Sequence, residues 1–294
     1  MPPSAAPIWA HLNAEERESQ YNPRVAVPDF ARHEAEFTAD NAAAREWPSA
    51  VFDVPYGSHP LRRLDIFPAQ GAPGVLAPVH VFFHGGFWRA LDKAAFSYVA
   101  GALAPLGFTT VVANYELCPA STLDGVVDSA LAAFEWVQRH IARYGGDPAH
   151  ISISGASAGA HLCGEILSAD WAARGFPEAH VDGAALISGI FDPEPARLTS
   201  LNREICLDAG LVARHNLELR PPTLLCPLTL AVGGAEPWQW IDQSFRYSHH
   251  LRRHEIAHTL HVLPGRNHFS IMRDYLAEDS LVRRAIAAMK KPAG

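Results

Sequence analysis

Short apolar runs alternate with helix-like segments along most of the chain, and this alternation limits the possible folds more than any other feature. The first two runs alternate apolar and polar residues, which is typical of a hairpin with one exposed face. The later runs are almost entirely apolar, which is typical of parallel strands buried on both faces. The expected strands are 50–56, 61–67, 79–84, 108–114, 150–155, 182–188, 227–233 and 258–265.

The segments between these strands have the periodicity of helices. The clearest is 124–146, where apolar side chains recur at steps of three and four residues from Val127 to Ile141. We expect Gly145 to end this helix in the left-handed conformation and Asp147-Pro148 to form a turn. Strands joined by helices in this way predict an α/β fold whose mostly parallel sheet carries helices on both faces.

The alternation covers most of the chain, so we predict a single domain over residues 1–294 with eight strands. Two parts lie outside the alternation. Residues 1–48 are polar and rich in proline, and we expect them to form an N-terminal helical segment. Residues 189–224 do not show this alternation of strands and helices, and we interpret them as a small cap-like insertion over the sheet.

The composition argues against several kinds of partner. Hydrophobic residues make up 48% and charged residues 19% of the chain, which is enough for a large packed core. The net charge is −7 and no basic block occurs, so neither a nucleic acid nor an anionic membrane is an expected partner. The N-terminus lacks the pattern of a signal peptide, and no apolar run approaches the roughly 18–20 residues of a membrane span.

Cysteine usage indicates the compartment. The four cysteines are scattered without a Cys-x-x-Cys pair, so we interpret them as reduced thiols of a cytoplasmic protein (Cys118, Cys163, Cys206 and Cys226). The sequence predicts no oligomeric state, and a homodimer stays open.

A candidate nucleophile follows the strand expected at 150–155. Gly155-Ala156-Ser157-Ala158-Gly159 matches Gly-x-Ser-x-Gly and precedes a helix-like segment. So tight a strand-to-helix turn requires small residues two positions before and after the serine. It projects the hydroxyl beyond the carboxyl edge of the sheet. We therefore predict Ser157 to be a nucleophile, with the backbone N–H of Ala158 as one oxyanion donor.

Partners for this serine are present later in the chain. In this architecture the order is Ser, acid, His. Glu236 comes shortly after the strand at 227–233, and His268 follows the last strand. The ends of parallel strands meet along one edge, so we predict a Ser157–Glu236–His268 triad. Asp242 is an alternative acid, although it lies further on and is expected within a helix.

The stretch His84-Gly85-Gly86-Phe87-Trp88 directly follows the strand at 79–84. Its glycines allow backbone N–H groups to turn toward a substrate oxygen, so Gly85, Gly86 and Phe87 are predicted to complete the oxyanion hole. We expect His84 to brace this loop rather than to transfer protons. Aromatic residues are predicted to surround the substrate together with His84, namely Phe87, Trp88, Phe191, Trp238 and Trp240.

A competing motif lies near the C-terminus. Residues 254–258 read HEIAH, which matches the zinc-protease pattern. That pattern requires both histidines on one helix, one turn apart. His258 instead begins a strand-like alternation, and Pro264-Gly265 prevents a long helix. We therefore expect no metal site here.

Taken together, these elements resemble the α/β-hydrolase fold, and more narrowly the arylformamidase (kynurenine formamidase) group and its esterase relatives. The His-Gly-Gly-x-Trp pattern at 84–88 and the segments 19–29, 54–67, 188–195 and 233–244 carry the resemblance. Around 197–222 the likeness is weaker, and Ala156 and Ala160 stand where His and Gly are common. The resemblance implies a Ser-Glu/Asp-His hydrolase, and the motif falls on Ser157, Glu236 and His268.

The resulting hypothesis is a cytoplasmic hydrolase without a cofactor that removes a formyl group from an aryl formamide such as N-formylkynurenine. Its partner is therefore a small aromatic amide or ester. A carboxylesterase for short acyl esters is the alternative. A non-catalytic binding protein of the same fold is a third, and it is expected to lack at least one member of the triad.

Overall fold

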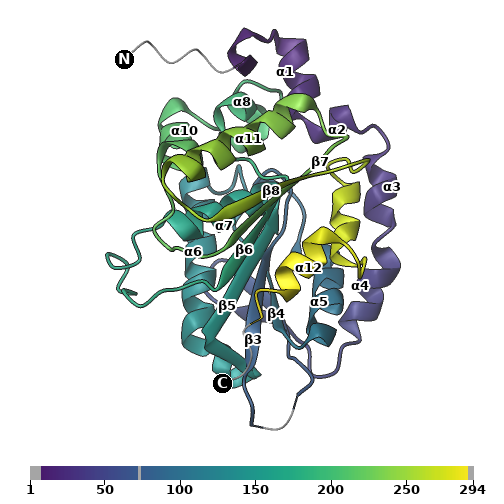
Figure 1. The fold of residues 1–294 in the computed structure, drawn as a ribbon, viewed down its shortest axis with the longest axis vertical. Helices are drawn as coiled ribbons and strands as arrows, with labels where there is room; N and C mark the ends of the chain where they lie inside the picture. The colour runs from purple at the N-terminus through teal and green to yellow at the C-terminus, as the bar shows by residue number, and fades with distance from the viewer. Residues whose placement is uncertain (1–7, 72–73, 291–294) are drawn as a thin grey trace.

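The computed structural model describes residues 8–71 and 74–290. Its centre is an eight-stranded sheet in the order β1-β2-β4-β3-β5-β6-β7-β8 (Figure 1). The pairs β1–β2 and β2–β4 are antiparallel, and the remaining neighbours are parallel. The strands are β1 Val51–Pro55, β2 Arg63–Phe67, β3 Ala77–Phe83, β4 Thr109–Ala113, β5 Gly146–Ala156, β6 Gly183–Ile187, β7 Leu228–Gly233 and β8 His258–Leu263.

Helices cover both faces of the sheet, which confirms the predicted fold class (Figure 1). The α-helices are α1 Ala14–Tyr21, α2 Pro23–Ala26, α3 Phe30–Ala35, α4 Thr38–Arg45, α5 Ser97–Leu103, α6 Leu123–His140, α7 Ala158–Ser168, α8 Glu194–Arg197, α9 Asn202–Ile205, α10 Ala209–His215, α11 Trp238–Arg253 and α12 Leu281–Ala287. Six 3₁₀ helices are described, η1 Ile8–His11, η2 Lys93–Phe96, η3 Ala104–Leu106, η4 Ile141–Tyr144, η5 Leu217–Leu219 and η6 Ser270–Tyr275.

Strand β3 shows why the central strands are mostly apolar. Val79, Val81 and Phe83 face a core formed with α6, α7 and α11. Phe82 points to the other face, into a core formed with α5, η6 and α12. Because side chains alternate between the faces of a strand, helices on both faces require apolar residues at nearly every position.

The N-terminal segment crosses from one face of the molecule to the other. Helix α1 contacts α11, and α4 contacts α5 on the opposite side. In Figure 1 this segment, coloured purple, runs from the top of the molecule down its right-hand side. Residues 8–48 therefore pass over the edge where the strands β5 and β7 end.

Two details of the expected elements differ from the structure. The helix predicted at 124–146 ends as an α-helix at His140 and continues as η4 to Tyr144, before Gly145 adopts φ 78°. The turn predicted at Asp147-Pro148 lies inside β5, which begins at Gly146. The register of β5 against β3 shifts there, and Asp147 Oδ1 accepts a hydrogen bond from the Ala149 N–H.

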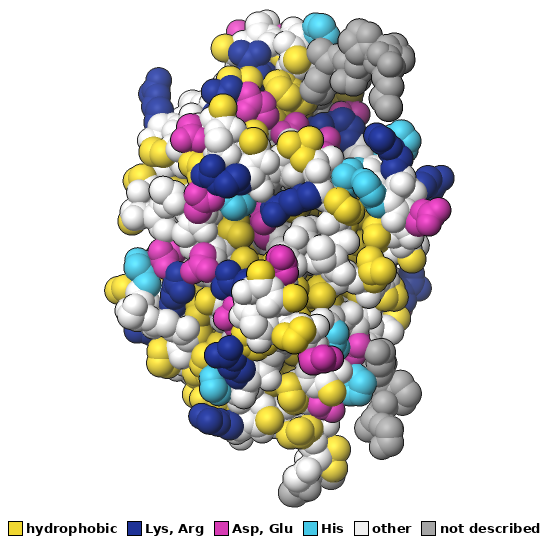
Figure 2. Space-filling view, turned by 90° about the vertical axis from the view of Figure 1, so that its left-hand side faces the viewer, with side chains coloured by type: hydrophobic (Ala, Val, Ile, Leu, Met, Phe, Trp, Pro, Cys, Tyr) yellow, Lys and Arg dark blue, Asp and Glu magenta, His cyan; other side chains and the backbone are white. Residues whose placement is uncertain are grey.

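On the face drawn in Figure 2, basic and acidic side chains are interspersed. This face therefore presents no extended basic patch of the kind that tracks a phosphate backbone. Within residues 8–71 and 74–290, none of the helices has the length and apolar character needed to span a bilayer.

Candidate active site

Ser157 stands at the sharp turn between β5 and α7. Its backbone has φ 55° and ψ −118°, a strained conformation that its N–H stabilises by donating to the Ile187 carbonyl at 2.8 Å. A Cβ on Gly155 would lie 2.3 Å from the carbonyl carbon of Gly159. A Cβ on Gly159 would lie 1.9 Å from the Phe83 carbonyl oxygen. Both glycines are therefore required where the turn approaches its neighbours, as the motif predicts.

The structure brings Glu236 and His268 together. Glu236 lies between β7 and α11, and His268 lies on the loop between β8 and η6. His268 Nδ1 is 2.7 Å from Glu236 Oε2. The other carboxylate oxygen accepts from Ser188 Oγ at 2.5 Å and from the Gly233 N–H at 2.7 Å. The carboxylate is thus fully buried and held on both oxygens, which fixes the orientation of the imidazole.

Asp242, the alternative acid, lies elsewhere. It is on α11 and accepts from Arg246 Nε at 3.0 Å. Arg246 also pairs with Asp192 and Glu218, so Asp242 belongs to an ion-pair cluster around Arg246.

His268 and Ser157 line one open cavity, whose empty space, including the part open to solvent, is about 670 Å³. No hydrogen bond joins His268 Nε2 to Ser157 Oγ among the described contacts. Catalytic hydrogen bonds are often long in free enzymes and shorten when substrate binds. The cavity wall also contains Gly85, Gly86 and Phe87.

The loop after β3 has the geometry of an oxyanion site. Gly86 has φ 115°, and a Cβ there would lie 2.1 Å from the Ala90 carbonyl oxygen. Phe87 and Trp88 follow at φ 55° and 57°. A Cβ on Gly85 would lie 3.4 Å from Ser157 Cβ, so the loop lies directly beside Ser157. Within the described part of the chain, the N–H groups of Gly86, Phe87 and Ala158 donate to no other residue. The strained loop therefore leaves donors available beside Ser157.

The buried His84 side chain holds this loop in place through hydrogen bonds. Its Nδ1 lies 2.6 Å from the Gly85 carbonyl oxygen, and its Nε2 lies 3.0 Å from Asn114 Oδ1. Tyr115 Oη donates to the same Gly85 carbonyl at 3.2 Å. Because the C=O and N–H of a trans peptide point in opposite directions, this clamp turns the Gly86 N–H away from His84. Burial lowers the pKa of His84, and its hydrogen bonds to Gly85 and Asn114 act in the opposite direction.

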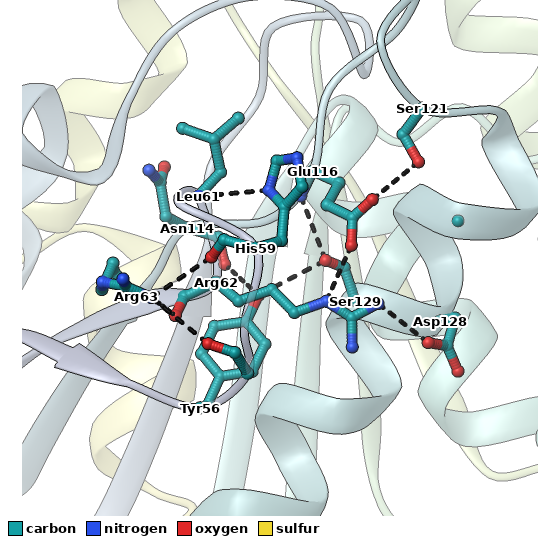
Figure 3. A network of polar contacts seen from close by, with 12 residues as sticks. Tyr56, His59, Leu61, Arg62, Arg63, Asn114, Glu116, Ser121, Asp128 and Ser129 are labelled. Carbon is teal, nitrogen blue, oxygen red and sulfur yellow. Dashed lines mark hydrogen bonds and ion pairs between the residues drawn. The ribbon is translucent and has the colours of Figure 1, made fainter.

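Asn114 connects this clamp to a larger polar network. The backbone carbonyl oxygen of Asn114 accepts a hydrogen bond from Tyr56 Oη at 2.6 Å (Figure 3). Ser129 Oγ lies near the same hydroxyl and accepts from the Glu116 N–H. Arg62 in turn bonds Glu116 Oε1 at 2.7 Å. The β1–β2 hairpin is thereby fixed to the segment that carries the clamp.

Four of the residues predicted to bind the substrate occupy buried positions behind the cavity. His84 and Trp88 are fully buried, and the Trp88 ring packs edge-on against His161 at 5.0 Å. Phe191 stacks on Tyr247 at 4.2 Å. Trp240 donates from Nε1 to the Ser188 carbonyl and packs edge-on against the His268 ring at 4.6 Å. We therefore correct their assignment from substrate contact to support of the loops that carry Gly85 and His268.

Trp238 is half exposed at the start of α11 and does not line the cavity. Of the predicted aromatic residues, Phe87 lines it. Ala156 lines the cavity as well, whereas Ala160 is buried within α7, so Ala160 does not reshape the cavity wall.

The N-terminal segment also lines the cavity, which no sequence motif predicted. Asn22, Pro23, Arg24 and Glu34 line the cavity, although they lie more than a hundred residues before Ser157. Phe96, Phe269 and Met272 add further apolar wall. The segment 19–29 contributed to the family resemblance, and this was the one available signal.

The two histidines of the HEIAH motif lie at the end of a helix and at the start of a strand, as expected. Helix α11 ends at Arg253 with His254 as its C-cap, and His258 begins β8. His258 Nε2 bonds Ser248 Oγ at 2.8 Å. The two histidines therefore do not share a helix face.

Comparison with known proteins places these features in a family. Residues 80–272 match a family model described as alpha/beta hydrolase fold. The chain is 27% identical over 296 residues to a kynurenine formamidase of Danio rerio, covering 96% of this chain and 98% of the relative. It is 36% identical over 156 residues to the esterase LipQ of Mycobacterium tuberculosis (strain ATCC 25618 / H37Rv), covering 50% of this chain and 37% of that protein.

Solved structures show the same architecture. A candidate thioesterase from Silicibacter sp. TM1040 superposes with a TM-score of 0.76 at 23% identity, covering 92% of this chain and 98% of that one. Esterase B from Lactobacillus rhamnosis superposes with a TM-score of 0.69 at 18% identity, covering 91% and 96%. These likenesses support the fold.

Proposed function

Because the chain belongs to the α/β-hydrolase fold family, we propose that it is a serine hydrolase that removes a small acyl group, formyl above all, from an aryl formamide. The observation that carries this proposal is the 2.7 Å contact between the buried Glu236 carboxylate and His268, which lines the same cavity as Ser157. An oriented imidazole beside a serine is the arrangement that activates a hydroxyl for acyl transfer.

In the first half-reaction, His268 takes the proton of Ser157 as Oγ attacks the carbonyl carbon. The oxygen of the tetrahedral intermediate accepts from the N–H groups of Ala158 and of Gly86 or Phe87. The C–N bond then breaks, and His268 returns the proton to the departing aromatic amine. Water repeats the sequence on the acyl-enzyme, releasing formate and restoring Ser157. Glu236 holds the imidazole tautomer and stabilises its cation throughout.

The preference for a formyl group has two supports. Relatives named kynurenine formamidase cover nearly the whole chain, and N-formylkynurenine is therefore the first substrate to examine. Phe87 lines the cavity directly after the oxyanion glycines, and we expect its side chain to leave less space for an acyl chain than a glycine at this position.

The test compares kcat/KM for formyl, acetyl and octanoyl derivatives of one aromatic amine or phenol, corrected for intrinsic reactivity. We expect the order formyl, acetyl, octanoyl. The second candidate is a carboxylesterase for short acyl esters, which the similarity to esterase LipQ favours. Acetyl esters exceeding formamides would select it, and an octanoyl preference would contradict both proposals.

A cytoplasmic location is part of the proposal. It is supported by the four cysteines, which are all free, with Cys118, Cys163 and Cys226 buried and Cys206 exposed. Intracellular proteins keep such thiols reduced. Fractionation of the producing cells with an antibody against the chain tests the location.

A further inference from the structure

Three charged side chains line the otherwise largely apolar cavity around Ser157 and His268. They are Arg24, Glu34 and Arg89. Charges beside a cleft of low polarity act on a bound substrate more strongly than charges in open water. Each of the three is therefore a candidate for recognising a polar group on the substrate.

Arg24 lies on the side of the cavity that His268 occupies. Its guanidinium is 4.8 Å from the centre of the Phe30 ring. Phe30 packs against Phe269 at 5.7 Å, and Phe269 directly follows His268 and lines the cavity. Since His268 delivers a proton to the leaving group, the leaving group must lie on this side. Arg24 is thus placed toward the leaving group rather than the acyl group.

Arg24 and Arg89 differ in how firmly they are held. Arg89 Nη1 bonds Glu204 Oε2 at 2.7 Å, and its backbone N–H donates to the Gly86 carbonyl. Arg24 has a looser partner, since its Nη2 is 3.9 Å from Glu34 Oε1. Both side chains of that pair are 41% exposed. Among the described residues, the Arg24 guanidinium makes no hydrogen bond, so its donors are free to bind another acceptor.

We propose that Arg24 is a specificity-determining residue that selects substrates whose aromatic leaving group carries a carboxylate. Two parallel N–H donors of a guanidinium match the two oxygens of a carboxylate, and such charge-assisted bonds are stronger than neutral ones. Glu34 is the internal anion that the substrate carboxylate displaces. The proposal rests on the proposed hydrolase function but not on the identity of the acyl group.

The test uses two formanilides that differ in one group, a carboxymethyl substituent on the ring or its neutral carboxamide. The measured quantity is the ratio of kcat/KM for the carboxylate over the carboxamide. Arg24→Gln is expected to lower this ratio about tenfold, mainly through KM. Arg24→Lys keeps part of the preference, and Glu34→Gln raises the ratio because the competing anion is gone. High salt lowers the ratio of the wild type.

Arg32→Gln is the matched control. Arg32 belongs to the same segment, is 77% exposed and pairs with Glu36, and it does not line the cavity. We expect its ratio to equal that of the wild type. An unchanged ratio in Arg24→Gln, or a larger drop in Arg89→Gln, would overturn the proposal.

A failure of the proposed formyl preference can be distinguished from a failure of the role proposed for Arg24. An enzyme that hydrolyses aryl acetates but no formanilides refutes the proposed acyl group, and the same carboxylate–carboxamide comparison on acetates still tests Arg24. For a chain that hydrolyses neither, calorimetric titration with the two corresponding anilines measures the same preference. Equal binding of the two anilines would then refute the role of Arg24.

Discussion

Two buried carboxylates near helix α7 each face an imidazole, and they differ in what surrounds that imidazole. Glu236 and His268 meet at 2.7 Å near Ser157, the residue that precedes the helix. Glu165 and His215 meet at 3.1 Å farther along it. Both carboxylates are almost completely buried, so burial and pairing alone do not distinguish a catalytic pair from a structural one.

The distinction lies in the second nitrogen of each imidazole. His215 Nε2 is bound to Asp124 Oδ1 at 2.8 Å, and Glu165 also pairs with Arg220. This pair thereby joins α10 to α6 and α7. His268 Nε2 has no hydrogen-bond partner among the described residues, and its ring lines the cavity. A histidine can transfer protons to a substrate when one nitrogen is oriented and the other is free.

The largest expected effect comes from removing the nucleophile. Ser157→Ala is expected to lower kcat by a factor on the order of 10⁶, since the members of a triad act as a unit. Circular dichroism and the unfolding midpoint should stay at wild-type values, because the alanine keeps the turn. Substantial turnover by a correctly folded variant would refute the serine mechanism.

The next effect separates the two candidate acids. Glu236→Gln leaves an acceptor near His268 but no longer fixes its tautomer or stabilises its cation, so we expect kcat to fall by a factor on the order of 10⁴. Asp242→Asn is the control, because Asp242 contacts Arg246 and not the imidazole. Steady-state kinetics of both variants on one aryl ester measure which of the two carboxylates kcat depends on. A greater loss in Asp242→Asn would contradict the assignment.

The sequence predicted the sheet well because each strand carries its own signal. Every expected strand is present, and most boundaries agree within about two residues. The exception is β5, whose start at Gly146 is set by pairing with Ala77 of β3. That contact is tertiary, and the turn-forming Asp147-Pro148 gives no indication of it.

The cavity wall was predicted less well than the proximity of Glu236 to His268 and the placing of Ser157 and His268 at one cavity. Sequence motifs specify the residues expected beside the reacting atoms of the substrate, such as Gly85 and Ser157. They do not specify which aromatic side chains turn inward, and Trp88 and Phe191 are buried in the core instead. Arg24 reaches the site through the path of the N-terminal segment, which no local pattern encodes.

The structural pair should affect stability rather than catalysis. Glu165→Gln leaves His215 and Arg220 without their shared anion, and we expect it to lower the free energy of unfolding by about 3 kcal/mol. Its kcat should stay within about threefold of wild type, because Glu165 does not line the cavity. Urea unfolding and kinetics on the same preparation measure both. A loss of kcat comparable to that of Glu236→Gln would remove the distinction between the two pairs.

The smallest effect is the contribution of one histidine, His161, to the dependence of stability on pH. Burial lowers the pKa of His161, which packs beside Glu165 and His215, from 6.5 to about 4, and it lowers the pKa of His80 from 6.5 to about 3. Below pH 6.5 the unfolded chain binds protons at both histidines while the folded chain does not. The free energy of unfolding therefore falls as the pH drops, by at most about 1.4 kcal/mol per pH unit for each histidine, and these two groups add no dependence above pH 6.5. Urea unfolding near neutral pH and at about pH 5 measures this drop, and His161→Gln should reduce the difference between the two pH values whatever its absolute stability. An equal drop in that variant would show that His161 is protonated in the folded chain.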